Sequence, residues 1–310
     1  MINVSAKQTT LRRARAEGFL HLNPETVTRV REGTVPKGDV IATARAAGIA
    51  AAKRTADWIV FCHPIPLDWA EVTVTVEAEG LRIACEVESV WKTGVEMEAL
   101  TGVTGALVNA YDMLKPLDAS MTITDVQVVW KRGGKSDARD SFDPPLKAAV
   151  LVISDSTYAG KREDRSGRVI QDFLRDEPVT LATYEILPDE VDGIRKRVEA
   201  LARQEGMDLI ITTGGTGFGP HDVTPEAVAP LLDKRAPGIV ERIRQYGGQR
   251  TPYAMLSREI AGTIGETLVL TLPGSSRGCR ESLQALFPGV LHIFPMLKGG
   301  GHGTPAGSPQ

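Results

Sequence analysis

MDLIITTGGTGFGPHDVTPEA, residues 207–227, joins a continuous apolar run to a glycine-rich loop and the start of a helix. Strands of a parallel sheet have such runs, because helices cover both faces of the sheet. AAVLVIS (148–154) and LVLTLPG (268–274) have the same character. Helical patterns alternate with these runs at about residues 165–175, 191–205, 225–232 and 277–286. The second half of the chain is therefore predicted to be a three-layer α/β domain with a mostly parallel sheet, which binds ligands at the carboxyl ends of its strands.

The first half follows another pattern. Alternating apolar residues flank Glu79 and Gly80 and predict a hairpin: Val72, Val74 and Val76, then Ile83, Cys85 and Val87. Asp39 can cap a helix of small residues that reaches about residue 56. A second helix with an apolar face ends before Pro116, and a further strand follows at 121–130. We expect an α+β domain with an antiparallel sheet.

The two patterns are separated by KRGGKSDARDSFDPPLK (131–147), which is polar and rich in glycine and proline. The boundary is placed near residues 140–146, giving domains at 1–140 and 146–310. Two domains are also the expectation for 310 residues, because one hydrophobic core seldom organises a chain of that length.

Composition excludes several classes of protein. A formal charge of -3 provides no general basic field, so neither nucleic acid nor a membrane surface is an expected partner. Cys62, Cys85 and Cys279 have no CxxC spacing, which argues against disulfides and zinc and for a reducing, cytoplasmic compartment. The sequence has neither the apolar core of a signal peptide nor the roughly 20 apolar residues of a membrane span, so a soluble protein is expected.

The glycine-rich loop indicates an anion site. Gly214, Gly215 and Gly217 let a ligand approach the backbone, whose successive N–H groups can surround a phosphate. Neither GxGxxG nor GxxxxGK[ST] fits this loop, which disfavours a P-loop and a nucleotide-dependent oxidoreductase. A second anion site is expected at residues 273–276, ahead of a helix.

Five segments of the first half occur in an order and with a spacing that are typical of one family: KGDVIATARAAGIAAAKRT (37–55), FCHPI (61–65), KTGVEMEALTG (92–102), YDMLK (111–115) and GGKS (133–136). Together they resemble the MoaC-type cyclic pyranopterin monophosphate synthase family over residues 2–136. The resemblance implies a ferredoxin-like domain that converts a cyclised dihydroguanosine triphosphate to cyclic pyranopterin monophosphate and pyrophosphate. No cofactor is assigned to this domain. Asn3 departs from the family, which commonly has Asp in its opening strand.

The family match assigns roles residue by residue. Asp112 is the expected acid/base with Lys115 as its partner, and Lys53 and His63 are further catalytic candidates. The expected substrate-binding residues are Phe61, Cys62, His63, Met97, Glu98, Lys131 and Lys135. The chemistry agrees, because a triphosphate needs cations, which Arg54 could join, and a cation three residues away on a helix keeps Asp112 ionised. Taken singly, His63 could be structural, Met97 a core residue and Asp112–Lys115 a solvated surface pair.

Helix geometry adds a constraint. If Glu98 and Asp112 share one helix, fourteen residues separate them by about 21 Å. One chain could hardly close a site over that distance. We therefore expect a pocket shared between subunits, with the Glu98 end from one protomer and the Asp112 end from its neighbour.

In the second half, ISDSTYAGKREDRSG (153–167), LPDE (187–190), LSREIAG (256–262) and LTLPGSSRGCRESL (270–283) accompany the glycine-rich segment. The set resembles the molybdopterin-binding adenylyltransferases, which include MoaB, Mog and one gephyrin domain, over residues 147–297. The resemblance implies molybdopterin binding and its adenylylation with Mg²⁺ and ATP. The alternative is a pterin-binding or scaffolding module without catalysis. Both families are known for threefold symmetry, so a homo-oligomer, a hexamer or a trimer, is expected.

By match, Asp189 and Asp222 are the expected metal ligands. The expected molybdopterin- or nucleotide-binding residues are Ser154, Asp155, Thr213, Gly214, Gly215, Thr216, Gly217, Pro273, Gly274 and Ser275. Both metal candidates have another interpretation, because an Asp just before a helix is a good N-cap. For Asp164 and Ser166 a helix start is favoured over contact with the pterin.

Overall fold

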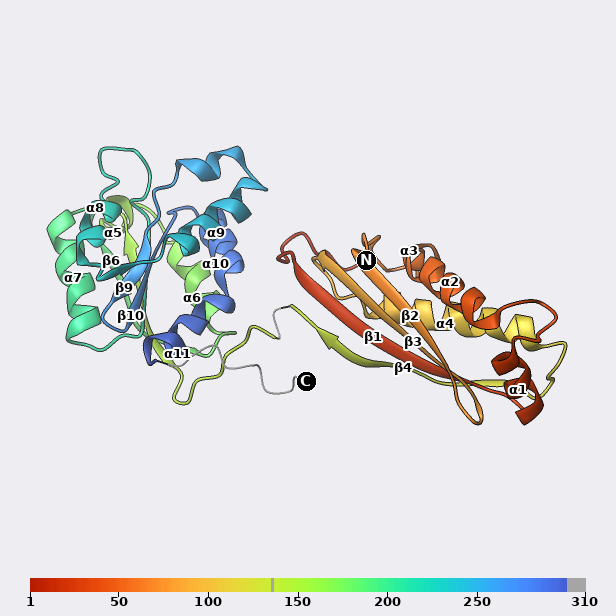
Figure 1. Ribbon diagram of the computed structural model, residues 1–310. Coiled ribbons are helices and arrows are strands. Elements are labelled where there is room, and N and C mark those ends of the chain that lie inside the picture. Colours follow the sequence, from red (N-terminus) through yellow and green to blue (C-terminus); the bar gives the residue numbers. More distant parts are fainter. Residues whose placement is uncertain (135–136, 300–310) are drawn as a thin grey trace. The chain divides into compact units, whose positions relative to one another are not determined.

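The computed structural model describes residues 1–134 and 137–299, so Lys135 lies outside the described residues. The chain divides into two compact units between Asp137 and Ala138, a few residues before the predicted boundary segment (Figure 1). Within the described ranges, no helix combines the length and apolar character needed to cross a membrane.

The N-terminal unit contains one antiparallel sheet with the strand order β2-β3-β1-β4. Its elements are β1 (Thr10–His21), α1 (Pro24–Glu32), α2 (Val40–Ala52), α3 (Thr55–Trp58), β2 (Trp69–Val76), β3 (Gly80–Trp91), α4 (Glu96–Leu114) and β4 (Thr122–Arg132). The order and the helical crossovers are those of a ferredoxin-like βαββαβ unit, so the predicted fold class is confirmed.

The predicted hairpin is β2 and β3, which pair with Val72 opposite Cys85 and Val76 opposite Leu81. The Asp39 carboxylate accepts a hydrogen bond from the N–H of Ala42 (2.9 Å) and caps α2. That helix ends at Ala52, earlier than expected, and the short α3 follows it.

The opening strand differs from expectation. The central strand β1 begins at Thr10, and Asn3 lies ahead of it, where its side chain accepts a hydrogen bond from the N–H of Ser5 (2.9 Å). The placement of Asn3 in a strand was therefore wrong. The strand itself was not predicted, because TLRRARAEGFLH alternates small residues with charged ones. Arg13 and Arg15 lie on the face opposite the core and pair with Glu86 at 3.3 and 3.7 Å.

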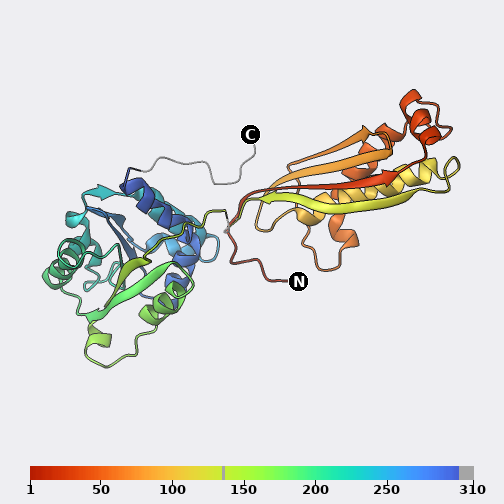
Figure 2. The ribbon, with the colours of Figure 1, turned by 90° about the horizontal axis from the view of Figure 1, so that it is seen from below.

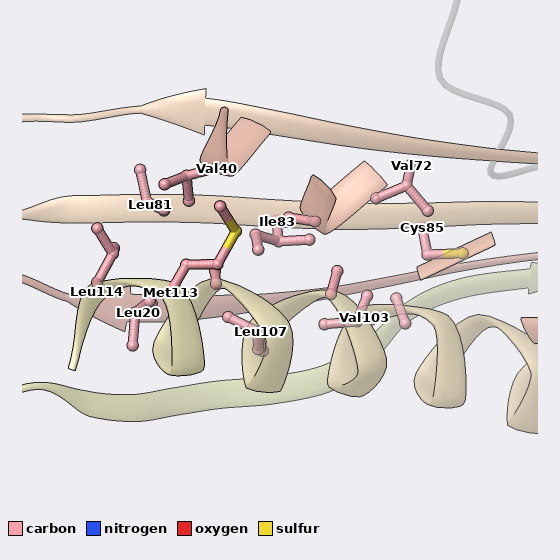
Figure 3. Packing of buried hydrophobic residues seen from close by; sticks show 14 of the residues in the cluster. Leu20, Val40, Val72, Leu81, Ile83, Cys85, Val103, Leu107, Met113 and Leu114 are labelled. Carbon is pink, nitrogen blue, oxygen red and sulfur yellow. The ribbon is translucent and has the colours of Figure 1, made fainter. Parts of the chain in front are cut away.

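The core lies between the sheet and the pair α2 and α4, as Figures 1 and 2 show for α4 along one sheet face. Side chains of α4, including Val103, Leu107 and Leu114, pack toward Leu20 and Ile83 of the sheet (Figure 3). The small residues of both helices allow close backbone contact. A Cβ on Gly48 would lie 2.9 Å from the carbonyl oxygen of Gly102, tighter than real side chains tolerate.

The C-terminal unit contains β5 (Leu146–Ile153), α5 (Asp155–Tyr158), α6 (Ser166–Leu174), β6 (Val179–Leu187), α7 (Val191–Arg203), β7 (Leu209–Thr213), α8 (Thr224–Val228), η1 (Ala229–Leu231), β8 (Lys234–Arg235), α9 (Pro237–Gly248), η2 (Pro252–Leu256), β9 (Ala261–Ile264), β10 (Thr267–Leu272), α10 (Ser276–Leu286), η3 (Gly289–His292) and α11 (Ile293–Leu297). Its sheet has the order β6-β5-β7-β10-β9-β8, with parallel pairing from β6 to β10 and antiparallel pairing beyond.

Helices cover both faces of this sheet. Apolar residues of α6, α9 and α10 form one core with alternate strand residues, and residues of α7 and α8 form a second core with the others. The predicted three-layer fold with a mostly parallel sheet is confirmed. The three apolar runs are β5, β7 and β10, whereas β6, β9 and α9 were not predicted.

The strand order creates a crevice at the carboxyl ends. From β5 the chain crosses to β6 on one side, whereas β7 lies on the other side of β5 and pairs with β10. Ligands of α/β sheets bind where strand order reverses in this way. The loops after β5, β7 and β10 all open at that edge.

The contact between α2 and α4 gives a stability prediction. Gly48→Ala should lower the free energy of unfolding of the N-terminal unit by about 1–3 kcal/mol, because the added methyl overpacks a closed helix interface. Gly193→Ala is the control, since an added Cβ on α7 meets only atoms at 3.9 Å. Ala is the better helix former, so that variant should gain about 0.5–1 kcal/mol. Urea unfolding measures both, and equal effects at the two sites would contradict this account of the packing.

Candidate functional sites

The first candidate site is a cavity of about 600 Å³ in the N-terminal unit. It lies between the N-terminal residues, the loop after α3 and the start of α4. Five of the seven expected substrate-binding residues line it: Phe61, Cys62, His63, Met97 and Glu98. Met1, Ile2, Lys7, Thr93 and Gly94 also line this cavity, and sequence reasoning had not singled them out.

Among the ionisable groups of the cavity wall, Glu98 has the most strongly shifted pKa. The residue is only 3% exposed, and this burial raises the pKa of its carboxyl to about 7, with a smaller contribution from the neighbouring Glu96 charge. Burial likewise raises the pKa of the Cys62 thiol, and Glu98 adds to that effect. Near neutral pH, Glu98 can therefore hold or release a proton, which suits either donation or acceptance toward a ligand.

Asp112 lies at the other end of α4, and its side chain is 56% exposed. Lys115 Nζ is 2.7 Å from its Oδ1, and Lys37 Nζ is 2.9 Å from its Oδ2. The hydrogen bonds from Lys115 and Lys37 hold the pKa of this carboxyl at about 2. The predicted pairing with Lys115 is present. Lys37 was not assigned a role, although it opens the first segment quoted for the family resemblance.

Three other cations considered in the sequence analysis, Lys131, Lys53 and Arg54, lie apart from Asp112 and Lys115. Lys131 on β4 donates to Glu96 Oε1 (2.9 Å), which places it near the Glu98 end of α4. Lys53 caps the end of α2, Arg54 follows it ahead of α3, and neither lines the cavity. Because Glu98 and Asp112 both belong to α4, about 21 Å of helix separates the two groups. The structure thus gathers the predicted residues at two ends of one helix.

The second candidate site is a cavity of about 450 Å³ at the carboxyl ends of β5, β7 and β10. It brings together eight of the predicted residues: Ser154, Asp189, Thr213, Gly214, Gly215, Asp222, Gly274 and Ser275. The other four lie beside it in the same loops: Asp155, Thr216, Gly217 and Pro273. The expected convergence of these loops on one crevice is therefore present.

The glycine-rich loop after β7 is held by contacts with the ends of β5 and β10. Gly214 has a φ of +103°, and a Cβ there would lie 2.2 Å from the Ile153 carbonyl oxygen. Its N–H donates to the carbonyl of Leu272 (3.1 Å), so this amide is engaged within the fold and does not belong to the predicted phosphate cradle. Ser275 caps α10 by accepting from the N–H of Gly278 (3.1 Å), so the helix expected after residues 273–276 is present.

Acidic side chains line one wall of this cavity. Asp155 and Asp189 exchange hydrogen bonds, each carboxylate accepting from the other's N–H (3.0 and 2.8 Å). Burial raises the pKa of Asp189, and the charges of Asp155 and Asp222 raise it further. His221 Nδ1 lies 3.6 Å from Asp155. A wall of this kind favours a bound cation, because mutual repulsion of the carboxylates is relieved by positive charge.

Neither metal candidate acts as a helix cap. Asp222 accepts from the N–H of Gly219 (2.7 Å), while α8 begins without a side-chain cap. Likewise α7 begins after Glu190 without one, and Asp189 bonds to Asp155 instead. The alternative interpretation of both as caps was wrong. By contrast, Asp164 accepts from the N–H of Gly167 (2.9 Å) and starts α6 as expected, although it also lines the cavity.

Arg258 supports the glycine loop and was not predicted to do so. Its guanidinium donates to the carbonyls of Gly217 and Asp222, both at 2.7 Å, and pairs with Glu226. The sequence signal was the LSREIAG segment, whose arginine had no assigned partner. Arg258 therefore fixes the distance between the segment ahead of β9 and the loop after β7.

Two family patterns match this chain: that of the MoaC family over residues 1–134, and that of a probable molybdopterin binding domain over residues 149–292. The molybdenum cofactor biosynthesis bifunctional protein of Chlorobaculum tepidum is 41% identical, over 97% of this chain and 96% of its own length. Cyclic pyranopterin monophosphate synthase 3 of Mycobacterium tuberculosis is 51% identical, over 47% of this chain and 84% of its own. The molybdopterin biosynthesis enzyme MoaB of Thermus thermophilus is 44% identical, covering 50% of this chain and 97% of that one, with a TM-score of 0.48.

The environment of Asp112 gives a titration prediction. Lys37→Met and Lys115→Met should each raise the pKa of Asp112 from about 2 toward its ordinary value, because each removes a donor and a positive charge that favour the carboxylate. Carbon-detected NMR of the carboxyl resonances against pH measures this shift. Asp118 serves as internal control, since its donors are Ser120 and Asn23 (2.6 and 2.7 Å). An unchanged Asp112 pKa in both variants would refute the assigned cause.

Proposed function

Because this chain belongs to the family of bifunctional molybdenum cofactor biosynthesis proteins, we propose that its two units catalyse two separate reactions of that biosynthesis. The N-terminal unit converts the cyclised dihydroguanosine triphosphate to cyclic pyranopterin monophosphate and pyrophosphate. The C-terminal unit binds molybdopterin and adenylylates it with Mg²⁺ and ATP.

The first activity is supported above all by the state of Asp112. A carboxylate kept ionised by two lysines is a base that stays deprotonated throughout the neutral range. The same lysines, Lys37 and Lys115, are exposed cations that can receive phosphate oxygens. Ring rearrangement and pyrophosphate release need both functions at one place.

The cavity around Glu98 supplies the other half of this site. Its wall combines apolar side chains with His63, Cys62 and Glu98, a composition suited to a heterocycle with polar edges. Since α4 holds this cavity far from Asp112, the complete site takes the Glu98 end from one protomer and the Asp112 end from its neighbour. An oligomer follows from this arrangement, and a hexamer or a trimer is the proposed state.

The second activity is supported by two features of one cavity, the glycine loop and the acidic wall. Adenylyl transfer joins two phosphates, so it depends on positioning and on charge neutralisation. Mg²⁺ commonly binds one or two protein carboxylates and completes its shell with phosphate oxygens and water. Asp189 and Asp222 fit that requirement.

The shared N-terminal site can be tested by mixing chains. Glu98→Ala and Asp112→Ala proteins should each be inactive in forming cyclic pyranopterin monophosphate from the cyclised triphosphate. Refolded together in equal amounts, they should recover about a quarter of the wild-type rate, because random assembly leaves that share of sites with both residues intact. Each variant refolded alone is the control. Absence of any recovery in a mixed oligomer of confirmed composition would contradict sharing.

Metal-dependent catalysis in the C-terminal unit can be tested at Asp222. Asp222→Asn should slow AMP transfer from Mg-ATP to molybdopterin by roughly 100-fold or more, the scale of losing a charge-stabilising group, while pterin binding persists. Asp192→Asn is the matched control, because its side chain on α7 is 84% exposed, pairs with Arg195 (3.5 Å) and does not line the cavity. A wild-type protein that binds pterin but transfers no AMP would instead support the non-catalytic module.

A further inference from the structure

Two arginines line the cavity at the carboxyl ends of β5, β7 and β10 without an acidic partner. They belong to the KREDR segment, residues 161–165, which connects α5 to α6. Arg162 and Arg165 are both exposed, and both line the cavity that also contains the glycine-rich loop and the acidic wall. Within residues 1–134 and 137–299, no carboxylate forms an ion pair with either guanidinium. Neither arginine was assigned a role from the sequence.

The two acids of the KREDR segment are engaged elsewhere. Glu163 pairs with Arg168 of α6 at 2.7 Å. Asp164 accepts hydrogen bonds from the N–H of Gly167 (2.9 Å) and from the hydroxyl of Tyr184 on β6. Both guanidiniums of the segment therefore remain available to an anion in the cavity, and the planar fork of donors on each matches the oxygens of a phosphate.

The cavity receives opposite charges from different loops. Its carboxylates include Asp189, after β6, and Asp222, after β7, whereas the two guanidiniums come from the KREDR segment ahead of α6. The carboxylates suit a metal ion at the reacting phosphates, but they repel the rest of a triphosphate, which carries its highest charge at the far end. Positive charge from the protein is needed at that end, and a guanidinium supplies it together with two donors for one phosphate.

We propose that Arg162 and Arg165 bind the β- and γ-phosphates of ATP and stabilise the pyrophosphate as it leaves. In the transfer, a phosphate oxygen of molybdopterin forms a bond to the α-phosphorus, and the bond from that phosphorus to the bridging oxygen of the β-phosphate breaks. The bonding electrons stay with the bridging oxygen, so the pyrophosphate gains negative charge, which guanidinium donors stabilise. This inference rests on the proposed adenylyl transfer and adds the residues that select a triphosphate.

Replacing ATP by ADP tests the assignment on the full-length protein, because ADP releases phosphate instead of pyrophosphate. Wild-type protein should transfer AMP to molybdopterin from ATP with a kcat/KM at least about 10-fold above that from ADP, the scale of one hydrogen bond between charged groups. Arg162→Met and Arg165→Met should each lower this ATP:ADP ratio by about 10-fold and lower kcat with ATP by about 10- to 100-fold. The KM for molybdopterin should stay at the wild-type value in both variants.

Lys161→Met is the matched control, because it removes the same charge one residue away and Lys161 does not line the cavity. It should keep the wild-type ATP:ADP ratio, and an equal loss there would overturn the proposal in favour of a general attraction by the segment. Wild-type protein that uses ADP as well as ATP overturns it without any variant.

The competing phosphate is that of the pterin. A raised KM for molybdopterin in Arg162→Met and Arg165→Met, with an unchanged ATP:ADP ratio, would assign the two arginines to that phosphate and overturn the binding of pyrophosphate. Failure of the proposed function looks different, because wild-type protein would then transfer AMP from neither nucleotide.

Discussion

Both units depend on backbone segments that approach closer than a side chain would allow. In the N-terminal unit α2 and α4 touch at Gly48 and Gly102, so two helices fit over one sheet face with their small residues interleaved. In the C-terminal unit Gly214 lies against the Ile153 carbonyl, and a Cβ on Gly274 would lie 3.1 Å from the Gly214 Cα. These contacts draw the ends of β5, β7 and β10 together, which creates the cavity where the predicted residues converge.

A rigid helix explains why the predicted residues of the N-terminal unit lie in two separate groups. Val103, Leu107 and Leu114 fix one face of α4 to the sheet, so the helix cannot bend to bring Glu98 toward Asp112. Burial and exposure then give the two carboxyls opposite properties. The pKa of Glu98 rises to about 7, and that of Asp112 falls to about 2. Two acids on one helix thus differ in protonation at the same pH, because one is buried and the other is paired with two lysines.

Strands could be predicted from the sequence where the hydrophobic pattern matches their burial in the fold. Continuous apolar runs revealed β5, β7 and β10, because helices bury both faces of those strands. It did not predict β1, whose Ala14 and Ala16 face the core without large apolar side chains while Arg13 and Arg15 alternate with them. Most of the residues singled out in the ordered motifs line one of two cavities. Lys37 and Arg258 bond to partners distant in sequence, and such pairs cannot be identified from one sequence.

The segment ahead of β9 shows how alternation along extended backbone can serve two purposes. Successive side chains there point to opposite sides, so Arg258 reaches the loop after β7 while Glu259 faces a cavity beside α9. Arg258 is fully engaged, with bonds to the carbonyls of Gly217 and Asp222, whereas Glu259 retains an oxygen without a donor. Arg258 therefore organises the loop after β7, whereas Glu259 lies on the other side of the segment, 3.7 Å from Arg244.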